Sequence, residues 1–225
     1  RRALHRPAVN AGLGALLEPR HTAVVTMELQ VGVVGAGSLF PALTEAVAEL
    51  GVLGSAGRVC AAARSAGVRV VHAVAAERPD GLGQSVNCRI VALTAKRRAA
   101  GHAGAVDIGT PGVEIVAELD QRPEDIVVAR MHGVTPFTGT ELDPILRNLG
   151  VRTIVLMGVS LNVGVMGAAL SAVDLGYQVV LVRDAVAAVP AEYGQWILDH
   201  TMPMIATLAT AGEVTAAWAT THPGG

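Results

Sequence analysis

Residues 158–167 have the sequence Gly158-Val-Ser-Leu-Asn-Val-Gly-Val-Met-Gly167 and join two segments of opposite character. The preceding segment, Thr153-Ile-Val-Leu-Met157, is typical of a buried strand, and the pattern of residues 163–175 is typical of a helix. In an α/β sheet, the turn from the carboxyl end of a strand into a helix is where functional groups are commonly presented. Position Gly164, at the start of the helical pattern, carries no side chain.

The same alternation of strand and helix runs through the rest of the chain. Short apolar runs without polar interruption are typical of parallel strands that are covered on both faces. We therefore predict a three-layer, doubly wound α/β sheet of about six mostly parallel strands. The predicted strands cover residues 23–27, 68–74, 126–131, 153–157, 177–182 and 204–208, and the predicted helices cover 52–66, 140–149, 163–175 and 190–201.

Length and composition predict one domain. The chain has 225 residues without a break in composition, so we expect an N-terminal arm at residues 1–20 and a single domain at residues 21–225. A net charge of −2 gives no electrostatic reason to expect nucleic acid or an anionic membrane as a partner. No apolar run approaches about 18 residues, so no membrane span is expected.

The two cysteines, Cys60 and Cys88, do not have the spacing of a metal site. Cys60 lies in an Ala-rich helical pattern and is predicted to be a core residue, whereas Cys88 lies in a polar loop. Unpaired cysteines are consistent with a reducing cytoplasm. His72, within an apolar strand, is predicted to be a core histidine with its hydrogen bonds satisfied.

Four segments, in order, together resemble the isochorismatase-like hydrolase superfamily, most of whose members are cysteine hydrolases. The resemblance covers residues 20 to 210. The segments are Thr22 to Gln30, Val127 to Asp143, Gly158 to Gly167, and Leu175 to Ala185. The resemblance implies the same α/β fold and a homo-oligomer. No Asp-x-His arrangement follows the second strand, as it does in the metal-binding members, so neither a metal nor a cofactor is expected.

The resemblance also implies a catalytic Asp, Lys and Cys, and all three positions differ here. Glu28 occupies the Asp position, Met131 falls at the Lys position when the strand is aligned through Phe137, and Gly164 replaces the Cys. Without a thiolate there is no covalent thioester route, so amide hydrolysis of the nicotinamidase type is not expected.

One branch of the superfamily, the true isochorismatases, resembles this chain in having a Val-Gly or Ile-Gly step at the turn. Those enzymes protonate a vinyl ether, which requires a general acid rather than a nucleophile. Glu28 is the candidate acid or base. A carboxyl group at a buried strand end without a neighbouring ammonium group is expected to have a raised pKa. The alternative for Glu28 is a carboxylate that caps backbone N–H groups.

The remaining candidates are predicted to contact a substrate. Ser160 and Asn162 offer hydrogen bonds beside a helix N-terminus, although helix capping is an equally good interpretation. Arg89, in the long segment 76–112, could clamp a carboxylate, and a solvated loop charge is its alternative. The predicted substrate-binding residues are Gln30, Arg89, Met131, His132, Phe137, Ser160, Asn162 and Gly164.

Three hypotheses for function follow. The first is a Cys-independent hydrolase that acts on a small carboxylate-bearing molecule, with Glu28 as the general acid or base. The second is a catalytically inactive member that binds a small ligand or a partner chain through the same pocket. The third is a structural subunit whose pocket is filled by Met131 and Met166.

Overall fold

A six-stranded sheet in which every neighbouring pair of strands is parallel forms the centre of the molecule. The computed structural model describes residues 12–219. The strand order is β3-β2-β1-β4-β5-β6, which confirms the predicted doubly wound α/β sheet. The strands are β1 (Thr22–Met27), β2 (Arg69–Ala75), β3 (Ile126–Arg130), β4 (Thr153–Val159), β5 (Gln178–Ala187) and β6 (Thr207–Ala209).

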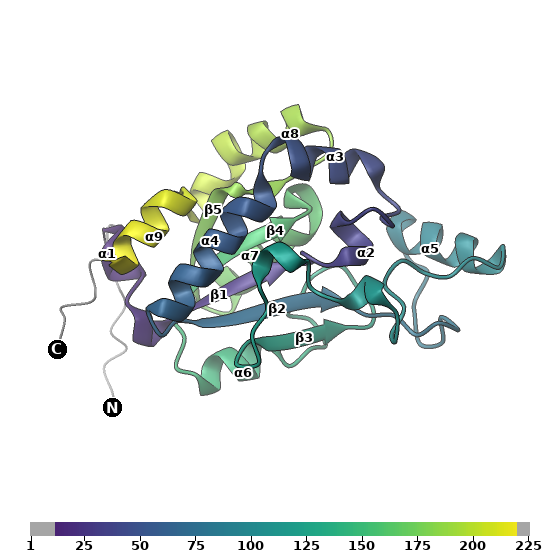
Figure 1. The fold of residues 1–225 in the computed structure, drawn as a ribbon, viewed down its shortest axis with the longest axis horizontal. Coiled ribbons are helices and arrows are strands. Elements are labelled where there is room, and N and C mark those ends of the chain that lie inside the picture. The colour runs from purple at the N-terminus through teal and green to yellow at the C-terminus, as the bar shows by residue number, and fades with distance from the viewer. Residues whose placement is uncertain (1–11, 220–225) are drawn as a thin grey trace.

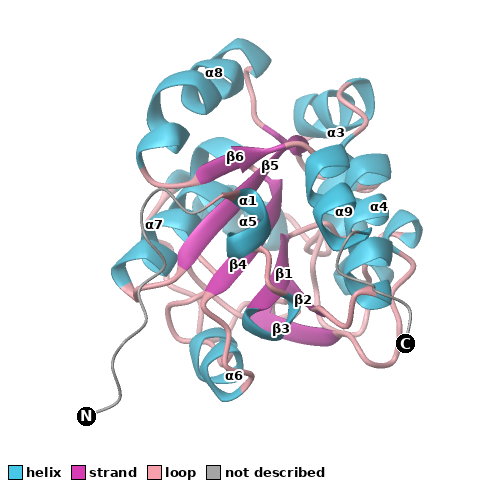
Figure 2. Ribbon diagram, turned by 90° about the vertical axis from the view of Figure 1, so that its left-hand side faces the viewer, coloured by secondary structure: helices cyan, strands magenta, loops and turns pink. Residues whose placement is uncertain are grey.

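Helices cover both faces of this sheet (Figures 1 and 2). Among residues 12–219, four short 3₁₀ turns and two π-helical turns add to them, the latter at Leu161–Val165 and Ile197–Thr201. The helices are α1 (Leu13–Leu16), α2 (Val31–Val34), α3 (Pro41–Glu49), α4 (Val52–Ser65), α5 (Arg89–Ala99), α6 (Leu142–Asn148), α7 (Met166–Asp174), α8 (Ala191–Trp196) and α9 (Ala211–Ala219).

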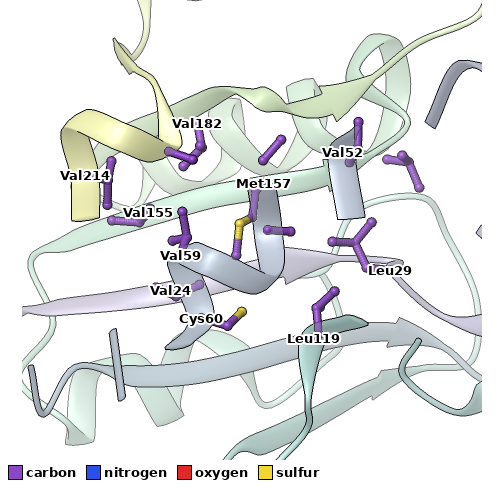
Figure 3. Close-up of a cluster of buried hydrophobic side chains, with 14 of the residues drawn as sticks. Val24, Leu29, Val52, Val59, Cys60, Leu119, Val155, Met157, Val182 and Val214 are labelled. Atoms are coloured by element: carbon purple, nitrogen blue, oxygen red, sulfur yellow. The ribbon is translucent and has the colours of Figure 1, made fainter. Parts of the chain in front are cut away.

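Two apolar clusters hold the layers together, one on each face of the sheet. On one face, α4 packs its buried side chains, among them Val59 and Cys60, against Val24 and Val155 of the central strands (Figure 3). The prediction that Cys60 is a core residue is therefore confirmed. On the other face, α6 and α7 bury Leu142, Leu146 and three alanines against the same strands. Because both faces are covered, the strands have few polar residues.

The predicted N-terminal arm divides into two parts. Residues 1–11 lie outside the described residues. Residues 12–20 do not form a separate arm, because Leu16 and Leu17 are buried in the core. The indole N–H of Trp218 in α9 donates a hydrogen bond of 2.9 Å to the backbone oxygen of Leu17, which joins this segment to the end of the described chain.

A chain of buried polar groups crosses the middle of the sheet. His72 accepts a hydrogen bond at Nδ1 from the Thr26 hydroxyl (2.8 Å) and donates one from Nε2 to Asp125 (3.4 Å). Arg64 donates two hydrogen bonds to the Asp125 carboxylate, at 2.7 and 3.1 Å. Burial lowers the pKa of His72, so the imidazole is neutral and both of its nitrogens are satisfied. His72 is thus a satisfied core histidine, as predicted.

This histidine is expected to make stability depend on pH. Because the folded state lowers the pKa of His72 from 6.5, the unfolded chain binds its proton more tightly, and stability is lost as the pH falls below about 6.5. The slope is at most about 1.4 kcal/mol per pH unit for one group. Urea unfolding between pH 7.5 and 5 measures it. In His72→Gln, the glutamine amide can replace both hydrogen bonds but does not titrate, so the pH dependence of the unfolding free energy that His72 causes disappears. Equal pH dependence in the natural protein and in His72→Gln would contradict the attribution to His72.

Asp125 contributes in a different pH range. Burial opposes ionisation of Asp125, but the hydrogen bonds from Arg64 and from the backbone N–H of Arg122, together with the nearby positive charge, lower its pKa. The stability that this carboxylate supplies is therefore lost only as the pH falls below about 3.8, its ordinary pKa. The two groups can be distinguished in one pH series.

No single helix among residues 12–219 is long and apolar enough to cross a membrane; α3 and α4 reach that length only as a pair with a 64° bend between them.

Candidate active site

A cavity of about 470 Å³ lies at the carboxyl ends of β1, β2 and β3, beside the turn from β4 into α7. This is the edge of an open α/β sheet at which ligands usually bind. Figure 1 shows α2, α3 and α5 on the side to which the arrowheads of β1 and β2 point. The side chains that line the cavity come from all these elements. The polar ones are Glu28, Glu77, Thr94, Arg130, Ser160 and Asn162.

Glu28 and Arg130 form an ion pair on the cavity wall. Glu28 directly follows β1, where its backbone takes a left-handed conformation with φ of 52° and its N–H donates to Ala73 O at 2.8 Å. Arg130 Nη2 lies 2.5 Å from Glu28 Oε1. Only 17% of the Glu28 side chain and 10% of the Arg130 side chain are exposed. A charge-assisted hydrogen bond in this enclosed position fixes the direction of the Glu28 carboxylate.

The guanidinium of Arg130 is only partly used by the protein. Its Nε donates to Gly133 O at 3.0 Å and its Nη2 is held by Glu28, but its buried Nη1 has no hydrogen-bond partner. The side-chain oxygen of Asn162 is also buried without a partner. Unpartnered buried polar atoms are costly and tend to occur at functional sites. One donor and one acceptor are thus available on residues that line the cavity.

The turn after β4 supplies Ser160, Asn162 and Gly164 to the cavity wall, and their contact with a substrate stays a prediction. Asn162 Nδ2 donates a hydrogen bond to Val189 O at 3.4 Å. No side-chain hydrogen bond caps the start of the π-helical turn Leu161–Val165. A Cβ atom on Gly164 would lie 2.9 Å from Met27 Cε and 3.2 Å from Val159 O. The side chain of Met27 therefore occupies part of the space that a residue larger than glycine would need here.

The prediction that Met131 lines the pocket is wrong. Strand β3 alternates between exposed and buried side chains, with Val128 and Arg130 facing inward. Met131 is the next residue, is 45% exposed and is not part of the cavity wall. The cation beside Glu28 is Arg130, one position earlier than the alignment through Phe137 placed it.

This arrangement also removes the premise for the sequence-based expectation of a raised Glu28 pKa. That expectation assumed that no cation lies near the carboxyl group. A guanidinium group lies 2.5 Å from it.

Gln30 and Phe137 are core residues rather than parts of the cavity wall. The fully buried amide of Gln30 donates to Ala75 O and Gly112 O at 2.9 and 3.0 Å and accepts from Ala75 N at 2.7 Å. It therefore joins β2 to the loop that follows α5. Phe137 is 7% exposed, and its ring lies 6.1 Å from that of Tyr177. Both residues hold the walls of the cavity in place without contacting it.

Arg89 and His132 are exposed and lie outside the cavity wall. Arg89 is the first residue of α5, and its neighbour Ile90 does line the cavity. His132 follows the end of β3. Their predicted substrate contacts therefore do not follow from this structure, although Arg89 adds positive charge near the cavity.

Neither cysteine lines the cavity. Cys60 is fully buried on α4, where burial raises the pKa of its thiol to about 12, so this thiol stays protonated. Cys88 is exposed and directly precedes α5. Within the described part of the chain, no group of three His, Cys, Asp or Glu side chains is placed to hold a metal ion.

Sequence reasoning missed the importance of α5 and of Glu77. Arg98 of α5 donates to Glu77 at 2.8 Å, to Gln84 at 2.9 Å and to Asp107 through a short hydrogen bond. Glu77 follows β2 and lines the cavity. This cluster attaches α5 to the sheet although only one residue of the helix, Val91, is buried. The basic residues at the end of α5 were the available signal.

The fold agrees with the comparisons to known proteins. The isochorismatase domain family matches residues 22–213, so the chain belongs to the isochorismatase family. A solved structure of an isochorismatase family protein from Desulfovibrio vulgaris is similar, with a TM-score of 0.74 and 28% identity over 89% of this chain and 99% of that protein.

Characterised and uncharacterised relatives are also similar. The ureidoacrylate amidohydrolase RutB of Rhizobium rhizogenes is 30% identical over 75% of this chain and 71% of that enzyme. The uncharacterised isochorismatase family protein YecD of Escherichia coli O157:H7 is 37% identical over 44% of this chain, a match that spans 52% of YecD. YwoC of Bacillus subtilis, another uncharacterised member, is 33% identical over 49% of this chain, a match that spans 58% of that protein.

Proposed function

We propose that this member of the isochorismatase family is a hydrolase that works without a cysteine nucleophile. Its substrate is a small carboxylate-bearing molecule with a cleavable C–O or C–N bond, such as a vinyl ether, and Glu28 is the general acid and base. The observation that carries the proposal is the Glu28–Arg130 ion pair, which lies on a cavity that Gly164 also lines and that no cysteine reaches.

Proton transfer by Glu28 accounts for either type of bond cleavage. For a C–N bond, the ionised carboxylate takes a proton from water, the water oxygen adds to the electrophilic carbon, and the proton passes to the departing nitrogen. For a vinyl ether, a protonated Glu28 gives its proton to the vinyl carbon, and water adds to the resulting cation and returns a proton to the carboxylate. The hemiketal so formed then loses its alkoxy group as the alcohol, which takes up the proton of the hemiketal hydroxyl and leaves a carbonyl compound. In both routes water supplies the oxygen, so no thiol is required.

Positive charge inside the cavity and outside it favours a substrate with a carboxylate. Arg130 lines the cavity, and its buried Nη1 has no hydrogen-bond partner. Helix α5, which forms another part of the wall, carries Arg89, Lys96 and Arg97 as exposed residues. Exposed cations at the mouth of a cavity attract anionic substrates and raise their local concentration.

A catalytically inactive, ligand-binding member is the second candidate. It is favoured by one observation, the glycine at position 164 in a turn where the family resemblance implies a nucleophile. The cavity and its unpartnered polar atoms would serve a bound ligand equally well. Turnover separates the two candidates, because only the hydrolase releases product.

The test is a turnover screen with isochorismate, related vinyl ethers and small amides, run on the natural protein and on a cysteine-free variant, Cys60→Ala/Cys88→Ser. We expect both proteins to convert the same substrate with rate constants within about threefold of each other, because neither thiol takes part. Exposed Cys88 tolerates serine, and Cys60→Ala removes one atom from the core at a cost of about 1 kcal/mol.

Two outcomes would contradict the proposal. Loss of turnover in a folded cysteine-free variant, restored by returning one cysteine, would place a thiol in the mechanism. Absence of turnover in the natural protein on every substrate, while the same compounds bind, would favour the ligand-binding member.

The cytoplasmic location and the homo-oligomer stay predictions. Apolar side chains on α7 and α8 that remain 41–56% exposed, namely Leu170, Val173, Tyr193 and Trp196, suit a contact between subunits, and the molar mass in solution decides it.

A further inference from the structure

The walls of the cavity differ sharply in polarity. The ion pair Glu28–Arg130 and the side chains of Ser160 and Asn162 come from the carboxyl ends of β1, β3 and β4 and form the polar end of the cavity. The parts contributed by α3, by the residues just before it and by α5 are almost entirely apolar, with Phe40, Leu43, Ile90 and Val91 as their large side chains. Thr94 is the polar side chain of α5 on this wall.

The one charged group outside the Glu28–Arg130 pair is already neutralised. Glu77 lines the cavity, but its carboxylate accepts a hydrogen bond from Arg98 at 2.8 Å, and 15% of its side chain is exposed. A second charge on a ligand would therefore meet apolar side chains without a free partner, which is costly.

The apolar walls are also incompletely covered. Phe40 is 37% exposed and Ile90 is 42% exposed, although both line a cavity. A volume of about 470 Å³ lies within the range of roughly 300–1,000 Å³ that holds drug-sized ligands. A molecule with only a carboxylate and a few polar atoms would leave much of this space and apolar surface unfilled.

We propose that the substrate of this site is an amphipathic monocarboxylic acid, with its carboxylate and scissile bond at the Glu28–Arg130 end and an apolar tail against Phe40 and Ile90. This inference rests on the proposed function for the position of the reacting end. The length and polarity of the tail are set by the α3 and α5 walls and are independent of catalysis.

Binding of unreactive acids tests the tail directly. Butanoate, hexanoate and octanoate are titrated into the full-length protein by calorimetry or by displacement of a fluorescent acid. We expect affinity to rise about fourfold for each added methylene, the factor that corresponds to about 0.8 kcal/mol per buried methylene. Hexanedioate, which carries a second carboxylate, is expected to bind at least tenfold more weakly than hexanoate.

Two variants on one helix locate the tail. Ile90→Ser removes an apolar wall residue, and we expect it to flatten the dependence on chain length. Leu93→Ser is the matched control, because Leu93 lies on the same helix, is 40% exposed and does not line the cavity. Both positions are exposed enough that folding is expected to survive.

Three results would overturn the inference. They are an affinity that does not depend on chain length, equal affinities for hexanedioate and hexanoate, and the same rise of affinity with chain length in Ile90→Ser as in the natural protein. Comparison with the primary amides of the same chain length separates the two proposals. Amides that bind as well as the acids, with the same rise along the series, would support the apolar tail and contradict the carboxylate in the proposed function.

Discussion

Replacing Glu28 with glutamine is expected to reduce turnover by about 10²–10⁴-fold, the usual contribution of a general acid or base. Glutamine keeps an oxygen that can accept the hydrogen bond from Arg130 Nη2, so a hydrogen bond between the guanidinium group and a neutral amide replaces the ion pair. The cavity is therefore expected to keep its shape. The amide cannot exchange a proton with water at neutral pH. The loss should therefore fall on kcat, with little change in the binding of unreactive acids.

The measurement compares kcat and inhibitor affinity for the natural protein, Glu28→Gln and Glu49→Gln. Glu49 is an exposed glutamate at the end of α3, so its variant makes the same chemical change away from the cavity. A folded Glu28→Gln protein that retains more than a tenth of the natural kcat would exclude Glu28 as the group that transfers the proton.

The position of Glu28 on the cavity wall could be predicted because a charge at the end of an apolar strand is visible in the sequence. Its partner could not be predicted in the same way. Choosing between Arg130 and Met131 required knowing which of two adjacent side chains faces inward, and a shift of one residue reverses every side chain of a strand. Alignment through Phe137, a core residue several positions beyond the end of β3, selected Met131, whereas Arg130 is the residue that faces Glu28.

The sheet itself was predictable because its strands are continuous apolar runs that pack on both faces. Helix α5 was not, because its exposed basic and alanine residues show little apolar periodicity and only Val91 is buried. What holds α5 in place is a set of ion pairs with residues before and after it in the chain. Similarly, the amide of Gln30 is satisfied by backbone atoms of Ala75 and Gly112, 45 and 82 residues away, and no local pattern announces such contacts.

Those ion pairs lead to the largest expected change in stability. Arg98→Met would leave the carboxylates of Glu77 and Asp107 next to each other, since these two residues are paired in an isolated β-bridge. Their side chains are only 15% and 4% exposed. Removing one partner from a buried ion pair typically costs about 3–5 kcal/mol, because the remaining charges are uncompensated. We expect a loss of this size in the free energy of unfolding measured in urea.

The neighbouring Arg97 gives the matched control. Arg97 is exposed, so Arg97→Met changes the same charge on the same helix and is expected to alter stability by less than about 0.5 kcal/mol. If Arg98→Met is too unstable to purify, Arg98→Lys keeps the charge but cannot reach Glu77, Gln84 and Asp107 together, and an intermediate loss is expected. Equal stability of the Arg97 and Arg98 variants would refute the structural role of this cluster.

The same substitution links stability to the cavity. Since Ile90, Val91 and Thr94 reach the cavity from α5, loosening this helix removes one wall while Glu28 and Arg130 stay on the sheet. Hydrogen exchange of residues 89–99 should therefore rise in Arg98→Lys before global unfolding, and the affinity for octanoate should fall more than that for butanoate. A uniform loss for both acids would mean that Arg98 supports the whole domain rather than the α5 wall.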